Sequence, residues 1–362
     1  MVKQLKDIGY EVKETYKPNP KETIPYISLE HVEPQSLHLC GISTSEAIES
    51  NKFRFKMGDV LFSTLRPYFR KLIIAPVDGV CSTEFSVVRP FDQEDLHYLF
   101  YCMAQKSFIE LTVANSSGDR PRTKWELFSK FEIHHITVHD RKKIGAVLAK
   151  YDDLIANNRR RIKLLEESAR LLYREWFVHF RFPGHEDTRI INSLPEGWKK
   201  KPLRDCFTLN YGKALKSEVR TDGPFPVYGS SGIIGSHNKA LVEGAGIIVG
   251  RKGNVGSVFW ATADFWPIDT VYFVHRDESN LYLYYALQNM TFTSTDVAVP
   301  GLNRNFAYSR EILIPKEKIL SEFITEASLI RKQIETLEKY NHKLAEARDL
   351  LLPRLMSGEL EV

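Results

Sequence analysis

The chain has 362 residues, of which 43% are hydrophobic and 27% are charged, and its formal net charge is +4. This length accommodates two domains of ordinary size together with connecting elements. No stretch approaches the ~18 uncharged apolar residues that a membrane span needs. The four cysteines are scattered with no C-x-x-C spacing. The scattered positions of the cysteines argue against a structural zinc site and against a disulfide framework. We therefore expect a cytoplasmic protein.

The first predicted domain covers residues 1–140. Short runs of β-branched and aromatic residues alternate here with Gly, Pro and Asn, and a helical pattern follows near the end of the domain. This arrangement is typical of an α+β fold. The domain holds 17 basic and 19 acidic residues, so its charge alone does not indicate a polyanionic ligand.

A long helix is predicted over residues 141–181. Apolar residues recur there at alternating three- and four-residue steps, which is the spacing of a coiled-coil seam. The seam of this helix includes Ile144, Leu148, Ile155, Asn158 and Ile162. The segment holds 11 basic and 5 acidic residues. Its basic face either lies against phosphates or an acidic partner, or is simply solvated, and the residues alone favour neither.

The second predicted domain, residues 182–315, repeats the first. Two of the three matching pairs of segments lie at a common offset of 186 residues. The pairs are Gly58–Phe62 with Gly244–Ile248, Thr83–Val88 with Asp269–Val274, and Leu5–Asp7 with Leu203–Asp205. A repeat of this length indicates two copies of one globular α+β domain, not a solenoid of small units.

A second long helix is predicted over residues 316–362, with a seam at an offset of 175 residues from the first. Its seam includes Ile330, Gln333, Leu337, Leu344 and Leu351. Because each seam would otherwise be exposed, we expect the two helices to pair as an antiparallel coiled coil, which gives the chain an internal pseudo-two-fold symmetry. Asn158 and Gln333 occupy the same place in their seams, where a polar residue either fixes the register or reaches solvent.

The order of domain, helix, domain and helix resembles the specificity subunits of type I restriction-modification systems. The residues that carry the resemblance are Gly58–Pro67, Leu154–Ile162, Phe225–Gly235, Gly250–Ser257 and Leu352–Leu360. They occur in both domains and both helices. The resemblance implies target-recognition domains at 1–140 and 182–315, joined by spacer helices at 141–181 and 316–362.

The resemblance also implies a function. The chain would bind double-stranded DNA and read a split, asymmetric target, one half with each domain. Two modification subunits would dock on the helices and supply the methyltransferase chemistry. Restriction subunits, which form an ATP-dependent translocase and nuclease, would join them. The chain itself is then expected to be no enzyme and to need no cofactor and no metal.

Motifs for methyl transfer and metal binding are missing from the sequence. An adenine methyltransferase of the usual kind carries an Asn/Asp-Pro-Pro-aromatic loop, and this chain has no Pro-Pro pair. Its glycine-rich run from Gly244 to Gly256 fits neither the dinucleotide fingerprint nor the phosphate-binding loop. Strand–turn–strand geometry explains this run better. No His/Cys spacing offers a set of metal ligands.

Two other classes of function stay open on the residues alone. A self-contained nuclease or modification enzyme with a coiled-coil insert is disfavoured by the missing motifs and by the duplication. A coiled-coil adaptor that binds only proteins accounts for the helices but gives no role to two similar domains rich in glycine and arginine.

Candidate DNA contacts lie in the loops of both domains, since base edges and phosphates are bound by Arg, Lys, Asn and similar side chains. In the first domain they are Arg66, Arg70, Lys71, Arg120, Arg122 and Lys124. In the second domain they are Arg251, Lys252, Asn254, Asn303 and Arg304. The repeat places Arg66 beside Lys252 and aligns the two later loops, which favours a shared role.

Overall fold

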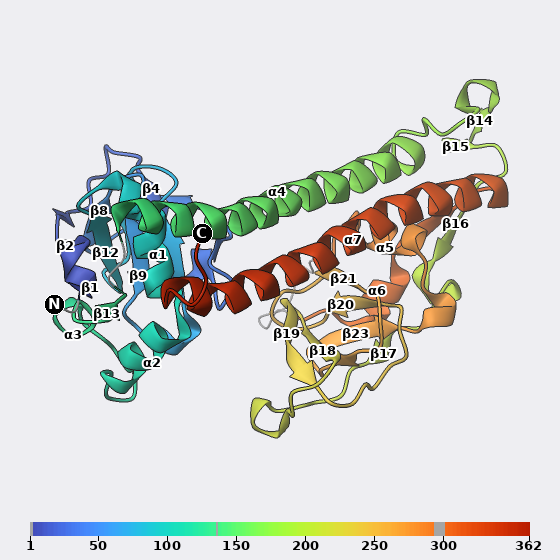
Figure 1. Ribbon diagram of the computed structural model, residues 1–362. Coiled ribbons are helices and arrows are strands. Elements are labelled where there is room, and N and C mark those ends of the chain that lie inside the picture. The colour runs from blue at the N-terminus through green and yellow to red at the C-terminus, as the bar shows by residue number, and fades with distance from the viewer. Residues whose placement is uncertain (1–2, 135–136, 293–300) are drawn as a thin grey trace. The chain divides into compact units, whose positions relative to one another are not determined.

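The computed structural model describes three segments of the chain, residues 3–134, 137–292 and 301–362 (Figure 1). The chain forms two compact units. Unit 1 consists of Met1–Arg160 with Leu337–Val362, and unit 2 consists of Arg161–Thr336.

Unit 1 is built around two sheets. A four-stranded antiparallel sheet has the order β10-β9-β12-β2, and a five-stranded sheet has the order β3-β8-β11-β4-β7, with β11 and β4 parallel. Two further pairs are β1-β13 and β5-β6. The strands are β1 (Lys3–Gln4), β2 (Gly9–Val12), β3 (Thr15–Tyr16), β4 (Pro25–Ile27), β5 (Val32–Glu33), β6 (His38–Leu39), β7 (Ser43–Thr44), β8 (Lys52–Phe55), β9 (Val60–Ser63), β10 (Leu72–Ile74), β11 (Gly79–Cys81), β12 (Phe85–Pro90) and β13 (Glu132–Ile133).

The central strand β9 of unit 1 is buried on both faces, which explains its continuous apolar sequence. Successive side chains of a strand point to opposite faces. Val60 and Phe62 therefore enter one core cluster, and Leu61 enters another. The first cluster also takes in helices α1 (Leu96–Ala104) and α2 (Lys106–Ala114) and the short helix α3 (Trp125–Phe128).

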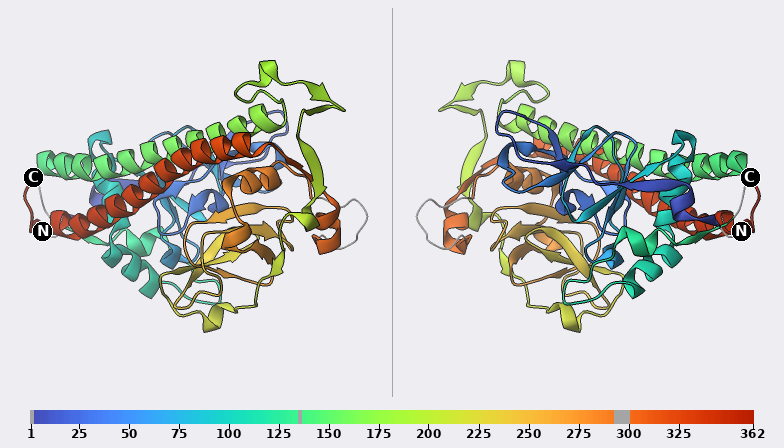
Figure 2. Two further views of the ribbon diagram at one scale, coloured as in Figure 1. Left: turned by 90° about the vertical axis from the view of Figure 1, so that its right-hand side faces the viewer. Right: turned by 90° about the vertical axis from the view of Figure 1, so that its left-hand side faces the viewer.

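Unit 2 has a four-stranded antiparallel sheet of order β17-β23-β20-β21 and a three-stranded sheet of order β19-β18-β22, with β18 and β22 parallel. The pairs β16-β24 and β14-β15 complete it. The elements are β14 (Ile190–Ile191), β15 (Leu194–Pro195), β16 (Lys199–Pro202), β17 (Asn210–Tyr211), β18 (Phe225–Gly229), β19 (Gly232–His237), β20 (Gly246–Gly250), β21 (Val258–Ala261), β22 (Trp266–Pro267), β23 (Val271–Val274), β24 (Glu311–Ile314), α5 (Leu281–Gln288) and α6 (Arg304–Ser309). The β14-β15 hairpin projects away from the sheets of its unit (Figures 1 and 2).

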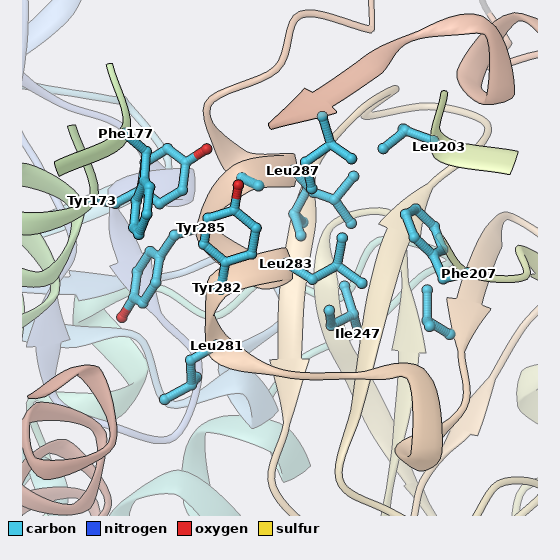
Figure 3. Close-up of a cluster of buried hydrophobic side chains, with 14 of the residues drawn as sticks. Tyr173, Phe177, Leu203, Phe207, Ile247, Leu281, Tyr282, Leu283, Tyr285 and Leu287 are labelled. Carbon is cyan, nitrogen blue, oxygen red and sulfur yellow. The ribbon is translucent and has the colours of Figure 1, made fainter. Parts of the chain in front are cut away.

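The core of unit 2 lies between helix α5, the four-stranded sheet and the long helices. Figure 3 shows Leu283 and Leu287 of α5 on the same side of this helix as Ile247 of β20, with Tyr173 and Phe177 on the other side of α5. Aromatic rings fill this junction.

The two units repeat one fold, as the sequence repeat predicts. The order β10-β9-β12-β2 in unit 1 corresponds to β21-β20-β23-β17 in unit 2. The ungapped offset of 186 is wrong by one residue in this sheet, because Leu61 pairs with Val87 whereas Ile247 pairs with Val274. The register is restored when β9 is aligned with β20 at an offset of 187 and β12 with β23 at 186, because the chain from β20 to β23 is one residue shorter than the chain from β9 to β12.

Two 40-residue helices follow the two domains, α4 (Val138–Phe177) and α7 (Glu317–Met356). The Thr137 hydroxyl accepts a hydrogen bond from the Asp140 amide at the start of α4 (3.1 Å), which caps the helix. The helices pack together and run antiparallel within each unit. In unit 1 the beginning of α4 shares a core cluster with the end of α7, and in unit 2 the end of α4 shares one with the beginning of α7.

The packing side of α7 differs from the expected seam by one residue over much of its length. The helices begin 179 residues apart, not 175. Ile334 is buried, whereas the adjacent Gln333 is exposed. The side-chain amide of Asn158, the polar seam residue of α4, donates a hydrogen bond to the side-chain oxygen of Asn341 in α7 (3.0 Å). Of the other expected seam residues, Ile144, Leu148, Ile155, Asn158 and Leu337 are buried, and Ile162, Ile330, Leu344 and Leu351 are half-buried.

Candidate nucleic-acid interface

Three of the candidate residues in unit 1 surround one cavity. Arg66, Lys71 and Arg120 line a hollow of about 420 Å³, together with Leu29, Pro34, Ser63, Leu65 and Phe69. The Arg66 amide donates to the Pro121 carbonyl (2.7 Å), so the loop around Arg120 lies beside the loop that follows β9. The sequence repeat does not reveal this proximity, since Arg66 and Arg120 are far apart in the chain.

Arg66 and Lys71 are held differently within this cavity. The backbone of Arg66 is left-handed, with φ of 50°, and its side chain is exposed. The Lys71 ammonium donates to the Leu29 carbonyl (2.6 Å), and burial lowers the pKa of Lys71. Lys71 therefore contributes charge to the wall, while the side chains of Arg66 and Arg120 are exposed and can reach outward.

Arg122 is neutralised by a carboxylate. Its guanidinium donates twice to Glu84, with Nε 2.9 Å from Oε2 and Nη2 2.5 Å from Oε1. The hydrogen bonds from Arg122 lower the pKa of Glu84 despite its partial burial. Lys124, in the same loop, is exposed immediately before α3.

Arg70 faces the long helix and not the cavity. Its side chain is 14% exposed, and it contacts the Asp349 carboxylate of α7 at 3.5 Å. The next residue along α7 toward the N-terminus, Arg348, is buried and pairs with Asp152 of α4 and with Asp349. This geometry favours an anchoring role for Arg70.

The candidates in unit 2 gather around a tyrosine. The guanidinium carbons of Arg251 and Arg304 lie 5.1 and 5.0 Å from the ring centroid of Tyr211. Arg251 directly follows β20, and Arg304 is the first residue of α6, so two distant segments deliver them. Distances of this size are typical of cation–π contacts.

Three further candidates in unit 2 lie on the adjoining loops. Lys252 is exposed, and its backbone bridges to Gly301. The Asn254 amide donates to the Ser231 hydroxyl (3.2 Å). The Asn303 side chain accepts hydrogen bonds from the first backbone amides of α6, so it is a helix cap.

Sequence reasoning missed Tyr211 and Glu84. Tyr211 stands in a two-residue edge strand and Glu84 in a turn before β12, and neither belongs to a motif. Neither an aromatic residue beside a Gly-Lys pair nor an acidic residue in a repeated segment carries a distinct signal in the sequence, because only the fold brings the loops together.

The described residues hold neither a cluster of metal ligands nor a helix suited to a membrane. Within segments 3–134, 137–292 and 301–362, no group of three or more His, Cys, Asp or Glu side chains is placed to hold a metal ion. Among the same residues, none of the helices combines the length and apolarity required to cross a bilayer.

Comparison with known proteins decides the family. The family model described as the type I restriction modification DNA specificity domain matches residues 1–167 and 195–339. The chain belongs to this family. It is the DNA specificity subunit of a type I restriction-modification system, the recognition component and not the catalytic one.

Relatives of this specificity subunit match along most of their length. The chain is 25% identical to the type I restriction enzyme MjaIX specificity subunit of Methanocaldococcus jannaschii, over 88% of this chain and 82% of that protein. It is 22% identical to the HindI specificity subunit of Haemophilus influenzae, over 98% of both. The crystal structure of the S subunit from M. genitalium has the same fold, with a TM-score of 0.52, 17% identity and coverage of 98% of this chain and 96% of that chain.

Proposed function

We propose that the specificity subunit reads a bipartite, asymmetric DNA sequence, with residues 1–140 reading one half and residues 182–315 the other. The observation that carries this proposal is the repeated four-stranded sheet, whose equivalent loops hold different side chains in the two units. One fold with two sets of loop residues provides two independent recognition surfaces. Because its proposed target is DNA, we expect the specificity subunit to act in the cytoplasm.

Two modification subunits are the proposed partners of the spacer helices at 141–181 and 316–362, and restriction subunits complete the assembly. Exposed residues of the helices support this part, among them Arg160 and Arg161. Leu355 and Met356 are buried in the core of unit 1, so they are not candidates for docking. Each interface is expected to bury at least about 1,000 Å².

Methylation profiling tests the division of the target. The subunit is assembled with its modification subunits, and the methylated sequences are determined for single alanine variants. Arg66→Ala and Arg120→Ala should alter the half read by unit 1, and Lys252→Ala and Arg304→Ala the other half. A good base contact provides about 1–3 kcal/mol of discrimination, which such a profile resolves.

Arg276→Ala is the matched control in unit 2, because Arg276 is exposed and lies outside these loops. It should leave the methylated sequence unchanged. Unchanged profiles in all four loop variants would show that the loops are wrongly assigned. Site-specific methylation by the complex without this chain would overturn the proposal itself.

A further inference from the structure

An aromatic pair forms a support at the edge of the four-stranded sheet of unit 2. Tyr211 and Tyr272 are backbone partners on β17 and β23, and their ring centroids lie 5.1 Å apart. Tyr272 is buried, and its hydroxyl donates to the Leu302 carbonyl (3.0 Å). Tyr211 is 50% exposed. A fixed ring thus supports a second ring that remains accessible from solvent.

Arg251 and Arg304 both rest on this exposed ring. A guanidinium that stacks through its face keeps the N–H donors of its edge available for hydrogen bonding. Arg251 donates through Nη1 to the Asp269 carbonyl (3.2 Å). Tyr308 adds a second ring 6.0 Å from the Arg304 guanidinium, and its hydroxyl accepts a hydrogen bond from the Leu209 amide.

Among the described residues, Arg251 and Arg304 have no acidic partner. Within segments 3–134, 137–292 and 301–362, neither Arg251 nor Arg304 forms an ion pair with a carboxylate. Their distances to one centroid place the two guanidinium carbons no more than about 10 Å apart. Because this upper bound is close to the screening length of about 8 Å at physiological salt, the repulsion between the two charges is weakened but not abolished. An anion bound between them removes this repulsion.

We propose that Tyr211 is a positioning residue that holds Arg251 and Arg304 in the geometry that accepts the phosphate backbone of DNA. This inference rests on the proposed function, in which unit 2 reads one half of the target. The ring fixes two long side chains before DNA arrives, so less conformational entropy is lost on binding. The arginine donors, and not the tyrosine, contact the phosphate oxygens.

The test measures DNA affinity of the complex with modification subunits, over a range of salt concentrations, on a duplex carrying the methylated target. Tyr211→Leu removes the ring and should weaken binding about ten-fold, since two cation–π contacts are lost. Tyr211→Phe keeps the ring and should bind within about two-fold of the wild type. Tyr10→Leu is the control, because Tyr10 lies on the corresponding edge strand β2 of unit 1.

The salt dependence separates positioning from charge. Arg251→Ala and Arg304→Ala should each reduce the slope of log affinity against log salt by about one. Tyr211→Leu keeps both charges and should lower affinity with little change in slope. Arg304→Lys retains charge without a planar stack and should weaken binding as Tyr211→Leu does. This variant keeps the test informative if Tyr211→Leu does not fold.

The outcomes distinguish this inference from the proposed function. If Tyr211→Leu and Arg304→Lys fold and bind DNA as the wild type does, the positioning role of Tyr211 is wrong. If Tyr211→Phe binds as weakly as Tyr211→Leu, the hydroxyl matters and the stacking argument fails. If Arg251→Ala and Arg304→Ala also leave binding and the second half of the target unchanged, the assignment of this half to unit 2 fails as well.

Discussion

The two units place different chemistry at equivalent points of one fold. In unit 1 the loop arginine Arg122 is paired with Glu84, and Lys13, just after edge strand β2, contacts Glu11 and Glu126. In unit 2 the corresponding edge strand β17 carries Tyr211, on which two arginines stack. Carboxylates therefore restrain Arg122 and Lys13 in unit 1, whereas an aromatic ring contacts Arg251 and Arg304 in unit 2. The backbone fixes where the loops meet, and the side chains decide how much positive charge remains available for DNA.

The junctions with the long helices differ in the same way. In unit 1, Arg348 of α7 is buried against Asp152 of α4, and the Tyr101 hydroxyl of α1 donates to the same carboxylate. In unit 2 the rings of Tyr173, Phe177 and Phe323 pack at centroid distances of 5.0–6.0 Å. A polar junction requires that each partner be present, whereas an aromatic junction tolerates changes that conserve volume.

Breaking the polar junction should have the largest effect. Arg348→Ala leaves the Asp152 carboxylate, which also accepts a hydrogen bond from the Tyr101 hydroxyl, without its cationic partner. The free energy of unfolding should therefore fall by about 3–5 kcal/mol. Urea unfolding of the chain measures the loss. Arg354→Ala is the control, because Arg354 is 50% exposed and pairs with Glu359 on the surface. Such a pair contributes about 1 kcal/mol or less, and an equal loss in both variants would contradict the importance of burial.

The amide contact between the helices should matter less. Asn158→Leu removes the donor to Asn341 and leaves a half-buried amide without its partner, which should cost about 1–2 kcal/mol. The double variant Asn158→Leu/Asn341→Leu should recover part of this loss, because both polar groups are then gone. Gln333→Leu should change the free energy of unfolding by less than about 0.5 kcal/mol, since Gln333 is exposed. A large effect of Gln333→Leu would indicate that Gln333 lies in the packed seam, as the sequence spacing predicts.

The anchoring of the unit 1 loop should have a smaller effect. Arg70→Ala removes a contact with Asp349, and a pair of this exposure should contribute about 1 kcal/mol or less. Asp349→Asn should give a similar loss of thermal stability. Neither variant should change the salt dependence of DNA binding if Arg70 only anchors the loop. If Arg70→Ala alone reduced the slope of log affinity against log salt by about one, Arg70 would be assigned to the DNA interface.

Sequence alone predicted the repeated α+β domains and the two long helices, because hydrophobic spacing and turn residues specify them locally. It did not predict which face of α7 is buried, since one-residue shifts of an apolar pattern differ little over a few turns. Gln333 and Ile334 are adjacent, and only the packing of the partner helix distinguishes them. The candidate cations were found by type and loop, but the roles of Arg70, Arg122 and Arg251 depend on Asp349, Glu84 and Tyr211, which lie far away in the sequence.

The smallest expected effect comes from making unit 1 resemble unit 2 at Glu84. The Thr64 amide donates to the Glu84 carbonyl, as the Arg251 amide donates to the Thr270 carbonyl, so Thr270 is the equivalent residue. Glu84→Thr therefore releases Arg122 and should raise DNA affinity a few-fold, with the salt slope steeper by about one. A Lys56→Thr variant, which changes an exposed cation outside these loops, serves as the control.

The pH dependence of the same variant gives an independent check. Because Arg122 holds the pKa of Glu84 below its usual value, the pair stabilises the fold at pH values above the unfolded-state pKa of about 4.3. This contribution disappears as pH falls through the lower pKa of the folded state. The free energies of unfolding of the wild type and Glu84→Thr should thus differ at pH 7 and converge in strong acid. A difference that persists unchanged at low pH would show that Glu84 stabilises unit 1 by packing and not by its charge.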